Sequence, residues 1–182
     1  MLREVRRIVT GHDAEGRSII ASDGISPHTK PNPAQPARGL TDLWRTNATP
    51  ADNAAPGDAA AVEVVLNPPA NGSVFRYFQI APESWNQDKS EAEKKEQARQ
   101  AFEAMGASHN QDSDARHPGM HKTDTVDYII LLQGEVTMLV DDGEVQMKPL
   151  DVVIQRGTNH SWVNTGSEPA VLAGILIDAE AV

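Results

Sequence analysis

The sequence contains no cysteine among its 182 residues. This excludes disulfide scaffolds, thiolate nucleophiles, and zinc or iron–sulfur sites held by cysteine. Basic residues are also few, because 16 Lys and Arg stand against 26 Asp and Glu and give a formal net charge of -10. Binding to a phosphate backbone depends on clustered Lys and Arg, so we expect no nucleic-acid partner.

Long apolar runs are missing as well. No stretch approaches the roughly 18 consecutive apolar residues of a membrane helix, so we expect no membrane partner. The residues from Met1 to Arg7 are mostly charged and lead into no apolar segment, so we expect no signal peptide. The absence of cysteine fits a reducing compartment. We therefore expect a soluble, cytoplasmic protein.

Short β-type runs separated by turn residues fill the first half of the chain. Residues 5–10 and 17–21 flank a segment with two glycines and predict a hairpin. Residues 26–35 contain three prolines, which predicts that they hold no regular element. Further strands are predicted at residues 40–47, 62–66 and 73–80.

The pattern changes to a helix over residues 89–105. Ser90 followed three residues later by Glu93 resembles a capping box, and Gly106 follows where a glycine commonly ends a helix. Ala98, Phe102 and Met105 fall on one side of this helix and are expected to lie against the strands. The charged residues of its first turns predict a solvated opposite face.

From residue 126 onward the sequence predicts almost only strands. The Asp142-Gly143 dipeptide is a strong hairpin signal. Many short strands at close spacing predict a mainly β sandwich or barrel. The predicted strands of this half are residues 128–132, 135–140, 145–147, 152–155, 161–164 and 170–177.

Two segments of this half resemble the sequence motifs of the cupin superfamily. The first family motif has the form HxH, three or four residues, Glu, six residues and Gly, and residues 121–134 are similar to it. The second has the form GD, four residues, PxG, two residues, His, three residues and Asn, and residues 150–164 are similar to it. The resemblance covers about residues 119–178, a third of the chain.

The resemblance implies a fold for the whole chain, residues 1–182, as one domain. It implies a cupin-type double-stranded β-helix, or jelly-roll barrel, with an N-terminal β extension and one inserted α-helix. The N-terminal extension and loops would occupy residues 1–60, the early barrel strands residues 62–80, the helical insertion residues 89–106, and the two motifs residues 119–178. The helix is a hypothetical lid over the barrel mouth.

By the same resemblance, His121, Asp127 and His160 match the positions of the metal ligands. Two imidazoles and one carboxylate suit non-haem Fe(II), and Zn, Ni or Mn are also compatible. The sequence departs from the family because Thr123 replaces the second His, and Asp127 replaces a Glu that is one methylene longer. Leu150 and Gln155 replace a Gly and a Pro, which affects the shape of a turn rather than the ligands.

Other residues near the motifs are candidates for the site. His117 is either a substitute ligand or a residue at the barrel mouth, and His117 or Asp127 is a candidate proton carrier. Arg76, Thr123 and Trp162 are candidate substrate-binding residues. Arg76 is either paired within the barrel or free to bind a carboxylate, and Trp162 is either a pocket wall or core.

Two classes of function remain open at this stage. The first is a metal-dependent enzyme acting on a small oxygenated or carboxylated organic molecule, as an oxygenase or in dehydration, isomerisation or decarboxylation. The second is a non-catalytic binding or sensing cupin with a degraded metal site, which the altered first motif favours. The predicted N-terminal hairpin and apolar edge strands also suggest a homodimer.

Overall fold

The computed structural model describes residues 1–112 and 114–182. One α-helix, α1 (Glu91–Ala104), and two 3₁₀ turns, Glu83–Asn86 and Ser108–Asn110, lie between β5 and β6. The strands are β1 (Arg6–His12), β2 (Ser18–Ile25), β3 (Thr29–Asn32), β4 (Gln35–Thr46), β5 (Ser73–Ile80), β6 (Thr125–Gln133), β7 (Val136–Val140), β8 (Glu144–Met147), β9 (Val152–Arg156), β10 (His160–Asn164) and β11 (Ala170–Asp178).

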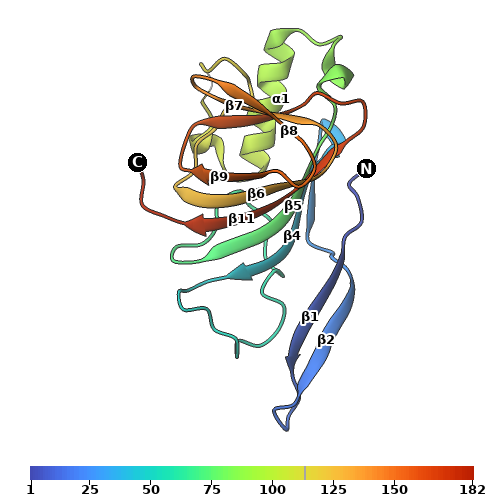
Figure 1. The fold of residues 1–182 in the computed structure, drawn as a ribbon, viewed down its shortest axis with the longest axis vertical. Coiled ribbons are helices and arrows are strands. Elements are labelled where there is room, and N and C mark those ends of the chain that lie inside the picture. The colour runs from blue at the N-terminus through green and yellow to red at the C-terminus, as the bar shows by residue number, and fades with distance from the viewer. Residues whose placement is uncertain (113) are drawn as a thin grey trace.

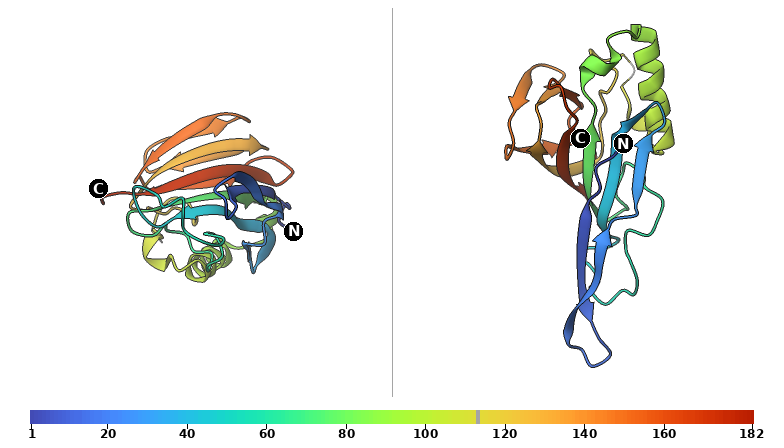
Figure 2. Two further views of the ribbon diagram at one scale, coloured as in Figure 1. Left: turned by 90° about the horizontal axis from the view of Figure 1, so that it is seen from below. Right: turned by 90° about the vertical axis from the view of Figure 1, so that its right-hand side faces the viewer.

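Two antiparallel sheets form the barrel, as Figures 1 and 2 show. The larger has the order β3-β4-β5-β11-β6-β9, and the smaller has the order β10-β7-β8. Apolar side chains of both sheets form one buried cluster: Ile80, Ile129, Leu131, Val136, Met138, Met147, Trp162, Ala170 and Leu172. The predicted mainly β fold with one inserted helix is confirmed.

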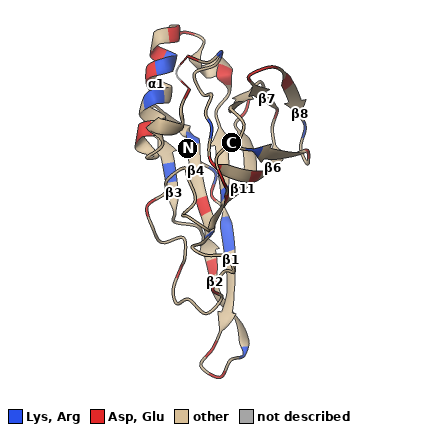
Figure 3. Cartoon of the chain, turned by 90° about the vertical axis from the view of Figure 1, so that its left-hand side faces the viewer, with Lys and Arg blue, Asp and Glu red and all other residues tan. Residues whose placement is uncertain are grey.

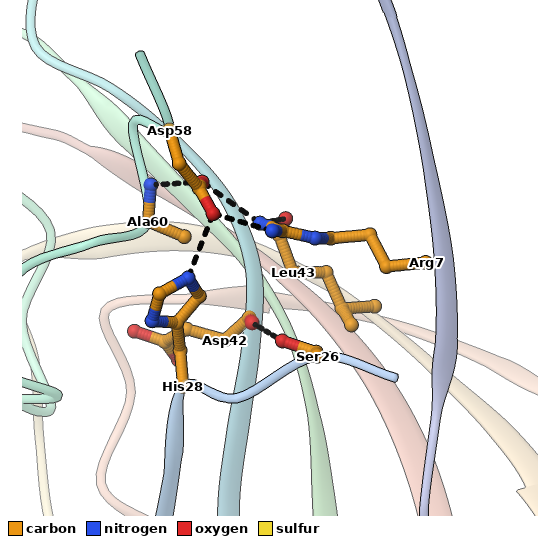
Figure 4. A network of polar contacts seen from close by, with 7 residues as sticks. All are labelled: Arg7, Ser26, His28, Asp42, Leu43, Asp58 and Ala60. Carbon is orange, nitrogen blue, oxygen red and sulfur yellow. Dashed lines mark hydrogen bonds and ion pairs between the residues drawn. The ribbon is translucent and has the colours of Figure 1, made fainter. Parts of the chain in front are cut away.

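The predicted N-terminal hairpin is present as β1 and β2 and extends away from the barrel (Figures 1 and 2). Its base is anchored by Arg7, which forms an ion pair with Asp58 and donates a hydrogen bond of 3.1 Å to the carbonyl oxygen of Leu43. His28 Nε2 contacts the same carboxylate at 2.8 Å (Figure 4). The hydrogen bond from Arg7 holds the pKa of Asp58 well below its usual range. Asp58 therefore ties the hairpin to the neighbouring loop.

Two local predictions are wrong. Residues 26–35 include the strand β3, whose Pro31 is tolerated because β3 lies at the edge of its sheet. Residues 62–66 form no strand. The carbonyl groups of Val65 and Leu66 instead accept hydrogen bonds from the side chain of Arg76. These acceptors are therefore satisfied without pairing to a neighbouring strand.

Helix α1 begins as predicted. Ser90 accepts a hydrogen bond from the backbone N–H of Glu93, and the Glu93 carboxylate accepts one from the backbone N–H of Ser90. Figure 3 shows charged residues of both signs along the helix, while Phe102 is buried against Leu66 and Ala107. The helix thus presents an apolar side to the protein. Within the described part of the chain, no helix has the length and apolar character needed to cross a membrane.

Candidate functional site

A cavity of about 180 Å³ lies between the barrel strands and α1. Most of its wall is apolar, and the polar groups on it are few, as in small-molecule sites generally. Leu40, Phe78, Ile80, Ala98, Ala101, Phe102, Met105, Ile129, Trp162 and Leu176 form the apolar wall. His117, His121, Asp127, His160, Arg38 and Arg76 are among the polar residues that line it.

The first histidine of the first motif meets the histidine of the second motif at this cavity. The backbone N–H of His121 donates to the carbonyl of His160, and the reverse bond is also present, both at 2.9 Å. Residues paired in this antiparallel way project their side chains to the same side. The two imidazole centroids are consequently 4.3 Å apart. The predicted convergence of His121 and His160 therefore occurs in the structure.

Both imidazoles are held in one orientation by the backbone. His121 Nδ1 lies 2.9 Å from the carbonyl oxygen of Gly119, and His160 Nδ1 lies 2.9 Å from that of Thr158. A carbonyl only accepts, so each Nδ1 carries the proton and each Nε2 keeps its lone pair. No described residue forms a hydrogen bond with either Nε2. Metal-ligating histidines usually have this arrangement, in which one ring nitrogen is fixed by an acceptor.

The histidines are also kept neutral. Burial lowers the pKa of His121 to about 3, and the neighbouring His160 and Arg38 contribute to this lowering. Burial lowers the pKa of His160 to about 4. Neutral imidazole is the form that binds a metal. Phe102 packs 5.1 Å from His121, and Trp162 packs 5.6 Å from His160, measured between ring centroids.

Asp127 lines the same cavity from β6. Its side chain is buried, and its Oδ1 has no hydrogen-bond partner among the described residues. Burial raises its pKa to about 6, although the Thr125 hydroxyl and the charge of Arg76 oppose the rise. An unpartnered carboxyl oxygen in a buried position is costly unless another group meets it.

We expect Asp127→Asn to stabilise the metal-free protein at pH 7. The folded-state pKa is raised from 3.8 to about 6, so the favourable protonated form is fully present below pH 4 and is lost as pH rises through 6. Removing the ionisation should increase the free energy of unfolding by up to about 3 kcal/mol at 1.36 kcal/mol for each pKa unit. Urea unfolding at pH 4 and pH 7 checks this. A variant that is equally destabilised at both values would contradict it.

The donor groups fit a divalent metal ion in their chemistry. They comprise two imidazole Nε2 atoms and one buried carboxyl oxygen, all lining one cavity. The described residues nevertheless contain no group of three His, Cys, Asp or Glu side chains already close enough to hold a metal. The predicted three-ligand centre is therefore not gathered.

His117 lines the cavity but is oriented differently from the other two histidines. Its Nδ1 accepts a hydrogen bond of 3.0 Å from the backbone N–H of Gly119 and contacts the hydroxyl of Ser161 at 2.9 Å. Since Nδ1 is the acceptor, the proton lies on Nε2. This tautomer suits a hydrogen-bond donor better than a metal ligand. Burial lowers the pKa of His117 as well.

The three predicted substrate-binding residues lie in different positions relative to the cavity. Trp162 lines the cavity between His160 and Phe78, and it also belongs to the core. Thr123 is buried away from the cavity, where its hydroxyl lies 2.7 Å from that of Thr125. Arg76 lines the cavity, but its guanidinium is paired with Asp42 at 2.9 Å. Arg76 is therefore paired within the barrel, which is the first of its two predicted alternatives.

Sequence reasoning missed Arg38, which lines the cavity from β4. The prediction started the strand at residue 40, so Arg38 fell in a loop. The alternation of side chains along β4 places Arg38, Leu40 and Asp42 on one face. Leu40 is buried in the core region and Asp42 pairs with the inward Arg76. A strand that began two residues earlier would have identified Arg38 as inward-facing.

Comparisons with known proteins show what the chain is similar to. Residues 110–178 match the family described as Cupin domain. The chain is 27% identical to the cupin-domain-containing oxidoreductase fogC of Aspergillus ruber, over 100% of this chain and 76% of the relative. It is 28% identical to phomopsin biosynthesis cluster protein C' of Diaporthe leptostromiformis, over 90% of this chain and 72% of the relative.

Among solved structures, the chain is similar to a Cupin 2 conserved barrel domain protein from Salinispora arenicola. The identity is 13%, the TM-score is 0.39, and the match covers 78% of this chain and 76% of that one. The family match spans both motif segments, including the two histidines that meet at the cavity. Residues 110–178 of this chain form a cupin domain.

Proposed function

We propose that this protein is a metal-dependent cupin enzyme that acts on a small organic molecule carrying oxygen functions. One observation carries the proposal. His121 and His160 meet in an apolar cavity, where each Nδ1 is fixed by a backbone carbonyl and each Nε2 keeps a lone pair that can bind a metal ion. The relative from Aspergillus ruber, whose name describes it as an oxidoreductase, supports oxidation as the reaction class.

In this proposal His121, His160 and Asp127 hold one divalent transition metal, with Fe(II) preferred and Zn, Ni or Mn as alternatives. Such an ion would supply Lewis-acid activation of a substrate oxygen and, if it is iron, access to redox chemistry. Asp127 would hold the ion together with the two imidazoles. Asp127 Oδ1 would gain the partner that it lacks among the described residues.

The protein itself would contribute binding, exclusion of water and proton handling. Phe102 and Trp162 pack against the imidazoles, and Phe78 packs against Trp162 and adds to the apolar wall of the cavity. The N–H at Nε2 of His117 is available to donate to a substrate oxygen. Asp127, with its pKa raised to about 6 by burial, is able to hold or release a proton near neutral pH when it is not a ligand.

A non-catalytic binding cupin is the second candidate. It is favoured by the absence, within residues 1–112 and 114–182, of three metal-binding side chains already drawn together. In this alternative the cavity binds a small molecule through its apolar wall, and the two histidines act only as hydrogen-bonding groups.

Measuring the metal content of protein purified without chelator separates the two candidates. We expect about one transition-metal ion bound to each wild-type chain and a loss of at least about ten-fold in the His121→Ala/His160→Ala variant, since both imidazole ligands are removed. His12→Ala is the matched control, because His12 is exposed on β1 of the hairpin. Circular dichroism confirms that the compared proteins are folded.

Each result of the metal measurement has a direct meaning. Iron lost in the double variant would lead to assays of oxygen uptake, while zinc, nickel or manganese would favour Lewis-acid chemistry. No metal in the wild type, even after reconstitution with each ion, would overturn the metal-dependent enzyme and favour the binding cupin.

A further inference from the structure

Three successive inward positions of β4 lie beside its neighbouring strand β5 on the inner face of the larger sheet. Asp42 pairs in register with Arg76, and Leu40 pairs with Phe78. Arg38 occupies the next inward position, one residue beyond the Gly39–Gln79 pair, and it lines the cavity. The inner faces of these strands therefore carry a charged pair, then an apolar pair, and then a single arginine.

Arg38 differs from Arg76 in its partners. The guanidinium of Arg76 contacts Asp42 and donates to the carbonyls of Val65 and Leu66. No described residue forms a hydrogen bond or an ion pair with the side chain of Arg38. Burial lowers the pKa of Arg38, and the charge of Glu83 only partly opposes this effect from beyond ion-pair distance. A half-buried guanidinium without a partner retains its capacity for bidentate binding of an anion.

The charge of Arg38 acts on the histidine side of the cavity. Arg38, His117 and His121 line the same cavity, and the charge of Arg38 contributes to lowering the pKa of both histidines. The wall that surrounds these groups is apolar and includes the inner side of α1, with Ala98, Ala101 and Phe102. Among the described residues that line the cavity, Arg38 is therefore a cation without an ion-pair partner, and the wall around it is mainly hydrophobic.

We propose that Arg38 binds the carboxylate of a small apolar organic acid in this cavity. The inference rests on the proposed function, because it takes the cavity as the substrate site. The two N–H groups of the guanidinium fork match the two carboxylate oxygens, and the apolar body of the acid contacts Leu40, Phe78 and Phe102. Arg38, rather than Arg76, sets the preference for an anionic substrate.

Calorimetric titration with cinnamate and with cinnamyl alcohol tests this assignment. The two probes share an apolar body and differ in the carboxylate. Wild-type protein is expected to bind cinnamate at least about ten-fold more tightly, as a charge-assisted bidentate contact predicts. Arg38→Gln should lose this preference and keep its affinity for the alcohol, while Arg38→Lys should retain part of it. Arg99→Gln, on the exposed side of α1, makes the same change in charge and should keep the full preference.

The titrations are made on protein as purified and again after treatment with a chelator. A preference for cinnamate that depends on Arg38 in both preparations supports the inference. This holds even if the protein contains no metal ion and the metal-dependent function fails. A preference that survives in Arg38→Gln and disappears with the chelator overturns the inference and leaves the proposed metal centre in place. Failure of the wild type to bind either probe at millimolar concentration also overturns the inference.

Discussion

Metal-free protein is expected to lose about 4 kcal/mol of unfolding free energy as the pH falls from 7 to 4. The cause is the burial of His121 and His160, whose pKa values are lowered from 6.5 to about 3 and about 4. In the unfolded chain both imidazoles bind protons near pH 6.5, while in the folded protein they stay neutral. Their contribution to stability is therefore present above pH 6.5 and lost as the pH falls toward the folded values.

The size of this loss of unfolding free energy follows from the shifts in pKa. At pH 4 each histidine accounts for a loss of about 3 kcal/mol. Asp127 acts in the opposite direction, because its raised pKa of about 6 favours the folded state in acid, and it offsets about 2 kcal/mol. The net loss is large compared with the total stability of most proteins, which is about 5–15 kcal/mol.

Urea unfolding in chelator at pH 7, 6, 5 and 4 measures the acid-linked loss. The variant His121→Gln/His160→Gln should show no loss over this range, and the remaining Asp127 contribution should make it more stable in acid. His109→Gln is the control, since His109 is exposed in the turn after α1. A wild type and a double variant with the same dependence on pH would show that the imidazoles are not held neutral by burial.

The parts of the fold that depend on local pattern were predictable from the sequence. The strands from β6 to β11, the Asp142-Gly143 hairpin and the Ser90–Glu93 capping box lie where turn residues and period-two alternation predict them. The meeting of His121 and His160 was predictable only through the resemblance to cupins. Spacing alone does not tell that two residues so far apart in the chain form an antiparallel bridge.

Features that depend on distant partners were not predictable. Residues 62–66 have an apolar pattern typical of a strand, yet the carbonyls of Val65 and Leu66 accept hydrogen bonds from Arg76 rather than from a neighbouring strand. The partner of Arg76 itself, Asp42, comes from another strand. Arg38 could not be recognised as unpartnered before its surroundings were known. In each case the outcome depends on residues that are distant in the chain, and the local sequence carries no information about them.

One departure from the cupin motif has a visible structural cost. Leu150, where the family has Gly, adopts a φ of 78° and is 78% exposed. A left-handed backbone costs an ordinary L-residue roughly 1–2 kcal/mol relative to glycine. The turn between β8 and β9 therefore keeps the conformation that glycine would favour, even though the sequence has lost the glycine.

Arg76→Met is expected to destabilise the protein by about 3–5 kcal/mol, because it leaves the carboxylate of Asp42 buried without its cation. Both side chains are almost fully buried, with 2% and 5% of their surface exposed. The same substitution removes the donors to Val65 and Leu66 and so loosens the segment that packs beside α1. Burial raises the pKa of Asp42 and Arg76 opposes this rise, so the pair depends on both members.

A double-mutant cycle in urea isolates the pair. Asp42→Leu/Arg76→Met should be more stable than Arg76→Met alone by about 2 kcal/mol, since replacing both members removes the orphaned charge. Recovery should be incomplete, because the carbonyls of Val65 and Leu66 still lack their donors. Arg99→Met provides the control, as its ion pairs on α1 are exposed and should leave stability nearly unchanged. Strictly additive effects of the two single substitutions would show that Asp42 and Arg76 do not stabilise the protein as a pair.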